Sequence, residues 1–88
     1  MPYQFTFTKR FQKHFQKLTP TEKTQLKKKL ELFSQTPMHP SLRTKHIQGT
    51  DQLYEFSVNM DIRVIWQYAN GRIIVLLDVG HHDILELY

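Results

Sequence analysis

The stretch LYEFSVNMDIRVIWQYANGRIIVLLDV, residues 53–79, decides the fold of this 88-residue chain. Asn70-Gly71 predicts a type I′ hairpin turn, because both central residues of that turn need positive φ angles. A second tight turn is expected at Met60 and Asp61. Apolar and polar residues alternate before the hairpin. The stretch after it is apolar at both odd and even positions, so both of its faces would be apolar, as in a central strand. Three consecutive strands are therefore expected, over residues 53–59, 62–68 and 72–79.

The residues upstream predict one more strand and two amphipathic helices. Apolar and polar side chains alternate over residues 2–8, the period of a half-buried strand. Thr8 is a candidate N-cap for a helix that buries one apolar stripe. Thr19-Pro-Thr-Glu22 has the form of a capping box with proline at the first helical position, and Pro37 ends this second helix. Residues 37–52 contain two prolines and a glycine without a clean period, so they are expected to form a loop.

The predicted order is therefore β-α-α-β-β-β, an α+β fold. Two N-terminal helices pack on one face of a four-stranded, mainly antiparallel sheet, and the other face stays partly open. Residues 1–88 are expected to form one domain, since a chain of this length supports only a small core. The longest apolar run, residues 73–77, is only strand length, and there is no cysteine. These features favour a soluble, cytoplasmic protein with no metal, no cofactor and no membrane partner.

Charge divides unevenly along the chain. Residues 1–50 carry ten Lys or Arg against two acids, whereas residues 51–88 carry two Arg against six acids. A basic half is typical of a protein that meets a polyanion such as RNA or the ribosome. A solvated helical face that only aids solubility is the alternative. The candidate RNA- and ribosome-binding residues are Lys9, Arg10, Lys13, Lys27, Lys28, Arg43, Lys45 and Trp66.

Arg63 is the cation that a strand would hold most rigidly. Alternation predicts that its side chain lies on the sheet face opposite Ile62, Val64 and Trp66. A guanidinium offers a planar set of donors that suits a phosphate, and an ion pair with Glu55 is the alternative.

Two further groups of residues could take part in acid–base chemistry. His81 and His82 follow the last strand, and His46 lies in the loop beside Lys45; each histidine could act as a general acid or base, or be a surface residue. Tyr88 could donate a hydrogen bond, stack on a base or pack on the sheet edge.

Several stretches together resemble the RelE/ParE superfamily of type II toxin–antitoxin toxins. FTKRFQKHFQKL and TPTEKTQLKKKLELF are similar to its paired helices, and HPSLRTKHIQGT is similar to its linking loop. LYEFSVNMDIRVIW is similar to its strand, turn and arginine-containing strand, and VGHHDILELY to its closing glycine, basic residue and aromatic. The resemblance covers nearly the whole chain and is nearest to the RelE/YafQ-like mRNA interferases.

The resemblance implies a metal-independent endoribonuclease that cleaves mRNA in the ribosomal A site and thereby inhibits translation. Arg63, aided by Lys45, would bind the scissile phosphate, and His82 would protonate the leaving oxygen. His46 or Asp61 would take the 2′-OH proton, with His81 in reserve. The YafQ-like branch has a further histidine where this chain has Ser57-Val58-Asn59.

Tyr88 or Trp66 would stack on a base of the bound mRNA. The partners implied are a cognate antitoxin, the ribosome and mRNA. A ParE-like inhibitor of DNA gyrase without nuclease activity is the alternative that the same fold allows, and a toxin relic or a plain RNA-binding module is a third.

Overall fold

The structure is a computed structural model that describes residues 3–88. Residue 2, where the first strand is expected to begin, lies outside the described residues. The helices and strands follow one another in this order: β1 (Gln4–Phe7), α1 (Lys9–Gln16), α2 (Pro20–Gln35), the 3₁₀ helix η1 (Pro40–Leu42), β2 (Lys45–His46), β3 (Tyr54–Ser57), β4 (Ile62–Asn70), β5 (Ile73–His81) and the 3₁₀ helix η2 (His82–Leu87).

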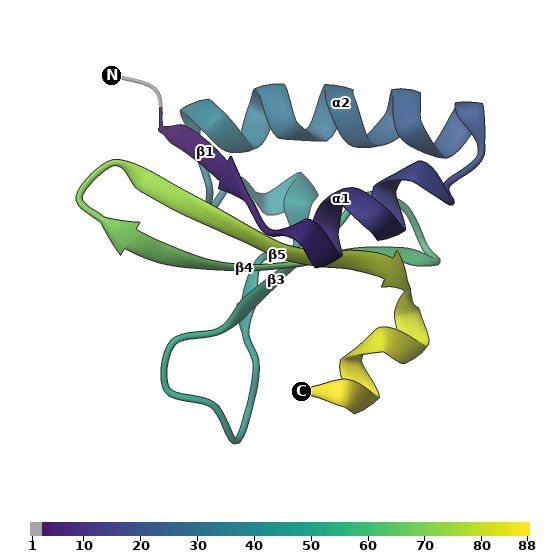
Figure 1. The fold of residues 1–88 in the computed structure, drawn as a ribbon. Helices are drawn as coiled ribbons and strands as arrows, with labels where there is room; N and C mark the ends of the chain where they lie inside the picture. Colours follow the sequence, from purple (N-terminus) through teal and green to yellow (C-terminus); the bar gives the residue numbers. More distant parts are fainter. Residues whose placement is uncertain (1–2) are drawn as a thin grey trace.

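One mixed sheet runs through the molecule, with α1 and α2 on one of its faces (Figure 1). Its strand order is β1-β5-β4-β3-β2; β1 pairs with β5 in parallel, and the other neighbours are antiparallel. The α+β class and the element order predicted from the sequence are confirmed. The predicted hairpin is also present, but its turn is displaced by one residue and is not type I′. Asn70 pairs with Ile73 as the last residue of β4, the two-residue loop is Gly71-Arg72, and of these only Gly71 has a positive φ, of 54°.

The predicted strand count is wrong by one. Lys45 pairs with Glu55 and His46 with Tyr54, so a two-residue strand lies within the expected loop and makes a five-stranded sheet. Both residues of this edge strand are exposed. A short polar edge strand of this kind protects the sheet against further pairing and carries no apolar period that a sequence pattern could reveal.

Both helices begin where their capping residues predict. Thr8 accepts a hydrogen bond from the Phe11 N–H at 3.0 Å. Thr19 and Glu22 form a reciprocal capping box, with donor–acceptor distances of 3.1 and 2.9 Å. The second helix ends at Gln35, two residues before Pro37, because a residue that precedes proline disfavours helical backbone.

The core lies between the two helices and the sheet. Phe33 of α2 is completely buried, and its ring centroid lies 4.6 Å from that of Phe56 and 4.8 Å from that of Trp66. Ile62, Val64 and Trp66 all face this core, so the alternation predicted for β4 is confirmed. The aromatic contacts add to the burial of apolar area, which is the main stabilising term.

The C-terminal residues fold back as η2 beside the end of β5, which the sequence analysis did not foresee (Figure 1). Gly80 permits this close approach, because a Cβ atom at that position would lie 2.5 Å from Ile84 Cγ2. The pairing of β4 with β5 shifts its register between Ile65 and Trp66: Asp78 pairs with Ile65, whereas Leu76 pairs with Trp66. Leu77 is therefore the extra residue of a β-bulge, which reorients the side chains that follow.

Candidate functional site

Arg63 lies on the sheet face opposite the core, as predicted. Its side chain is only 14% exposed, and its Nε lies 3.7 Å from Glu55 Oε1. Nη1 donates to the carbonyl oxygens of Asn59 at 2.8 Å and Met60 at 3.0 Å. The guanidinium thus holds the β3–β4 turn and also forms the ion pair with Glu55 that the sequence left open.

The adjacent histidines lie at the same end of the sheet as Arg63. In the register of β4 and β5, Arg63 pairs with Gly80, and Ile62 pairs with His81. His81 is the last residue of β5, His82 is the first residue of η2, and both are exposed. Arg63 and the two histidines therefore lie at one end of the β4–β5 pair, but His81 shares the core face of its pairing partner Ile62, so its imidazole is on the sheet face opposite Arg63.

His46 is not part of this group. It pairs with Tyr54, which pairs in turn with Trp66, so His46 lies on the core side of the sheet. Its ring contacts that of Tyr54, with centroids 5.5 Å apart. Strand spacing and rise per residue put its Cα about 14 Å from that of Arg63, two strands across and three residues along.

The other residues named from the sequence occupy three separate places. Lys45 pairs with Glu55 and shares the face of Arg63. Asp61 is exposed in the turn that precedes β4. Arg43 ends η1 in a left-handed conformation, with a φ of 51°.

Trp66 is wrongly assigned to RNA. Its side chain has no exposed surface, because it packs between Phe33 and Tyr54 in the core. A base cannot stack on a ring that no solvent reaches. Among residues 3–88, its Nε1 has no hydrogen-bond partner.

A cluster centred on Asp78 is the feature that sequence analysis missed. Asp78 is completely buried, and its Oδ2 accepts from Arg10 Nε at 3.0 Å and from the Tyr88 hydroxyl at 2.9 Å. Its Oδ1 accepts from the Val79 N–H at 2.8 Å and contacts His14 Nδ1 at 2.5 Å. The cluster joins α1, β5 and the C-terminus. The available signal was a lone acid inside the apolar run of residues 73–79.

Tyr88 therefore has a defined role in the structure. Burial, the hydrogen bond to Asp78 and the charge of that carboxylate raise the pKa of the Tyr88 hydroxyl, against an opposing effect of Arg10. The phenol stays protonated as a donor to Asp78, which holds the end of η2 beside β5.

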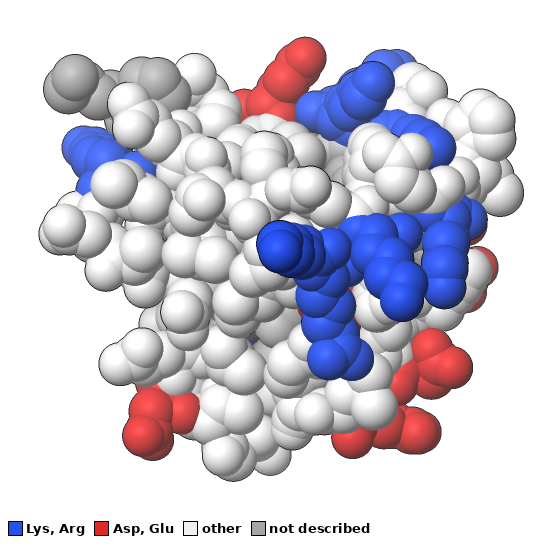
Figure 2. Space-filling view, viewed as in Figure 1, with Lys and Arg blue, Asp and Glu red and all other residues white. Residues whose placement is uncertain are grey.

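Lysine and arginine side chains gather over α1 and the adjoining part of the surface in Figure 2. Most acidic side chains on this face lie nearer the lower edge. The residues predicted to bind RNA on the two helices are all exposed: Lys9, Arg10, Lys13, Lys27 and Lys28.

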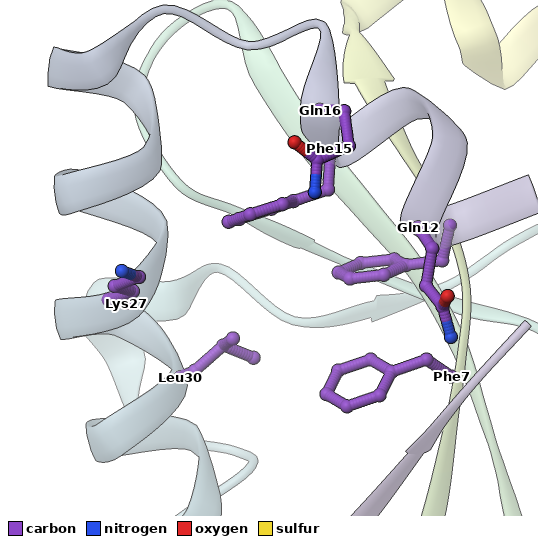
Figure 3. A pocket seen from close by; sticks show the side chains of 7 residues that line it. Phe7, Gln12, Phe15, Gln16, Lys27 and Leu30 are labelled. Atoms are coloured by element: carbon purple, nitrogen blue, oxygen red, sulfur yellow. The ribbon is translucent and has the colours of Figure 1, made fainter.

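An apolar groove separates the two helices (Figure 3). It encloses about 440 Å³. The side chains that line it are Phe7, Phe11, Gln12, Phe15, Gln16, Lys27 and Leu30. Phe7 is 46% exposed, although it is large and apolar.

Comparisons with known proteins agree with this architecture. Residues 5–85 match the family described as the ParE toxin of the type II toxin–antitoxin system parDE. A mutant of the E. coli toxin RelE in the free state is similar over 100% of this chain and 92% of its own, with 26% identity and a TM-score of 0.76. RelE in the RelE–RelB complex of Pyrococcus horikoshii OT3 covers 92% and 96% of the two chains, with 20% identity and a TM-score of 0.75.

A third structure, the E. coli DinJ–YafQ toxin–antitoxin complex, shares the fold at 16% identity and a TM-score of 0.77, covering 97% of this chain and 98% of the other. A search of the curated proteins found no match. No helix among residues 3–88 is long and apolar enough to cross a membrane. The family match spans nearly the whole chain, so the protein belongs to the ParE toxin family and is a toxin of a type II toxin–antitoxin system in the RelE/ParE superfamily.

Proposed function

We propose that the protein is a ribosome-dependent endoribonuclease that cleaves mRNA in the cytoplasm and so inhibits translation. The observation that carries this proposal is the pairing of Arg63 with Gly80, immediately before His81 and His82. A guanidinium at the end of the sheet that leads into His82 supplies residue types that cleavage through a 2′-OH requires. The 26% identity to E. coli RelE, over the full length of this chain, supports the same assignment.

The reaction needs three groups. A base removes the 2′-OH proton, the oxygen attacks phosphorus, and the bond from phosphorus to the 5′-oxygen breaks as an acid protonates that oxygen. We assign Arg63 Nη2 to the phosphate, because Nη1 and Nε hold the group in place. His82 would be the acid and Asp61 the base, because His81 lies on the core face, opposite Arg63. His46 is too far away for this role, whereas Lys45 shares the face of Arg63 and would support the phosphate.

Cleavage of mRNA during translation tests the proposal. Purified protein is added to an in vitro translation reaction, and cuts are mapped by primer extension. Codon-spaced cuts are expected from the wild type, with a loss of at least about 100-fold in Arg63→Ala and His82→Ala. His39→Ala is the matched control, since this histidine only caps η1. Intact message with folded wild-type protein would overturn the proposal.

Inhibition of DNA gyrase is the second candidate function. The family match to ParE favours it, and so does the Glu55 ion pair, which reduces the positive charge at Arg63. A plasmid supercoiling assay separates the two functions: loss of supercoiling with intact message would establish gyrase as the target and exclude the nuclease.

A cognate antitoxin is the expected protein partner, because RelE and YafQ occur in complexes with RelB and DinJ. The groove between α1 and α2 (Figure 3) offers apolar side chains beside Lys27, which suits an amphipathic acidic segment. Co-purification with the product of the adjacent gene tests this: Phe7→Asp is expected to abolish it, and unchanged co-purification would exclude the groove.

A further inference from the structure

A second cavity, of about 280 Å³, lies beside the C-terminal end of β5. Its polar lining comes from His14 and Lys17, at the end of α1, Glu22 in the first turn of α2, and His81. Leu18 and Val79 form part of its apolar lining. The cavity far exceeds the ~30 Å³ that one water molecule occupies in the liquid. Val79 and His81 pair with the core-facing residues Val64 and Ile62, so the cavity opens on the sheet face opposite Arg63 and is separate from that guanidinium.

Asp78 holds the imidazole of His14 in one orientation. Its buried carboxylate contacts Nδ1 of the ring at 2.5 Å and is itself fixed by Arg10, Tyr88 and the Val79 N–H. An ionised carboxylate only accepts, so Nδ1 carries the proton and donates it to Asp78. Nε2, on the far side of the ring, is then directed away from Asp78. A buried carboxylate that fixes the first nitrogen of a histidine leaves the second for another ligand.

With both of its imidazoles protonated, the cavity lining carries a net positive charge and favours an anion. The charge of Asp78 is matched by Arg10, whose Nε lies 3.0 Å from Oδ2. Among the described residues of the lining, the one acid is Glu22; its Oε1 accepts from the Thr19 N–H at 2.9 Å, and the Lys17 ammonium balances its charge. The remaining polar side chains of the lining are Lys17 and the two imidazoles. In a doubly protonated His14 ring, Nδ1 donates to Asp78 and Nε2 is a second donor on a side chain that lines the cavity.

We propose that this cavity binds a phosphate group through His14, Lys17 and His81, and that Asp78 acts as a positioning residue for His14. Charge-assisted hydrogen bonds from a lysine and imidazoles are the contacts that a phosphate prefers. The ligand is either a mononucleotide or a phosphate of an RNA strand. The proposal does not require the nuclease activity, because binding at this cavity is measured without cleavage.

Histidine NMR of the intact protein tests the site directly. Inorganic phosphate is titrated into the ¹⁵N-labelled protein in mildly acidic buffer, and the ring resonances of each histidine are followed. Saturable shifts are expected at His14 and His81, with none at His39, which caps η1. Lys17→Ala is expected to weaken binding at least tenfold, and His14→Gln to abolish it, because each loses a charge-assisted contact. His39→Gln is the control with unchanged binding.

The Asp78→Asn variant tests the charge of the positioning residue. Its amide oxygen can still accept from His14 Nδ1, but the carboxylate charge that favours a doubly protonated ring is lost, so phosphate binding is expected to fall at least tenfold, with altered ¹⁵N shifts in the free ring. Lys17→Ala, an exposed change, keeps the test valid if Asp78→Asn unfolds. The proposal is overturned if His14→Gln binds phosphate like the wild type, or if His39 shifts as much as His14.

Competition identifies the source of the phosphate. A short single-stranded RNA that displaces phosphate in a salt-dependent manner, at concentrations where a ribonucleoside 5′-monophosphate does not, assigns the cavity to RNA. Equal displacement by the monophosphate assigns it to a nucleotide. If neither displaces phosphate, no biological phosphate enters the cavity and the proposal fails. Cleavage of mRNA by the Lys17→Ala protein is measured separately, because the phosphate site does not depend on the nuclease proposal.

Discussion

Replacement of Asp78 is expected to cost a large part of the stability of the protein. The side chain is completely buried and receives four donors, two on each carboxylate oxygen. In Asp78→Asn the amide nitrogen replaces one carboxylate oxygen and so faces two donors that it cannot accept from. Replacement of Oδ2 costs less than replacement of Oδ1. The Tyr88 hydroxyl can rotate and accept from the amide, and the Arg10 side chain, which is 54% exposed, can turn toward water.

The magnitude follows from what the remaining contacts lose. Each charge-assisted hydrogen bond contributes about 1.5–3 kcal/mol and a neutral one about 0.5–1.5 kcal/mol, so two or three weakened contacts give a cost of about 2–4 kcal/mol for Asp78→Asn. Asp78→Ala leaves several buried donors unpaired and is expected to cost about 3–5 kcal/mol. A protein of this length is stable by about 4–13 kcal/mol, so either change is large.

Urea denaturation followed by circular dichroism measures both costs, provided that the slope of the transition stays the same. Asp51→Asn, at an exposed position outside the strands, is the matched control and is expected to stay within about 0.5 kcal/mol of the wild type. The reasoning would be refuted if Asp78→Asn were as stable as this control. A cost for Asp78→Asn above that of Asp78→Ala would also contradict the proposed rotation of the amide.

Three further predictions follow from single contacts. The pKa of Tyr88 is raised in the folded protein, so its contribution to the free energy of unfolding is complete below about pH 10 and is lost as pH rises through the folded pKa. In urea titrations at alkaline pH, Tyr88→Phe should therefore lose less stability with rising pH than the wild type. Thr19→Ala removes the capping box of α2 and should lower the free energy of unfolding by about 1 kcal/mol, whereas an unchanged urea midpoint would deny the cap a stabilising role. Gly80→Ala should displace η2, visible as exposure of Tyr88 in NMR spectra, and Ile84→Ala should restore its position; a double variant no better than the single one would exclude the clash.

Local signals explain how much of the fold was predictable. Capping residues, the hairpin and the alternation in β4 depend on signals within a few residues, and each was confirmed, although the hairpin turn is Gly71-Arg72 and not Asn70-Gly71. The strand β2 and the helix η2 were missed because they are short and partly polar. Pairing with β3 stabilises β2, and the absence of a side chain at Gly80 lets η2 pack beside β5. Neither cause leaves a period in the sequence.

The candidate site was less predictable, because it depends on register. Arg63 was correctly assigned to its face by alternation within one strand. His46 required the pairing of a two-residue strand, where a shift of one residue moves a side chain to the other face. In the observed register it aligns with Tyr54 and Trp66, away from Arg63. Its proposed role as the base is therefore assigned to Asp61, because His81 at the end of β5 also lies on the core face.

The topology nevertheless explains why α1 supplies the partners of Asp78. A buried ionised group needs paired donors, so an acid within an apolar strand implies basic side chains from another element. β1 runs parallel to β5 and ends with Phe7 opposite Leu76, so a helix that begins at Lys9 must emerge beside the residues after Leu76. Arg10 and His14 are four residues apart and hence share one face of that helix. The parallel edge of the sheet thus determines which basic residues reach the buried carboxylate, although 64 residues separate His14 from Asp78 along the chain.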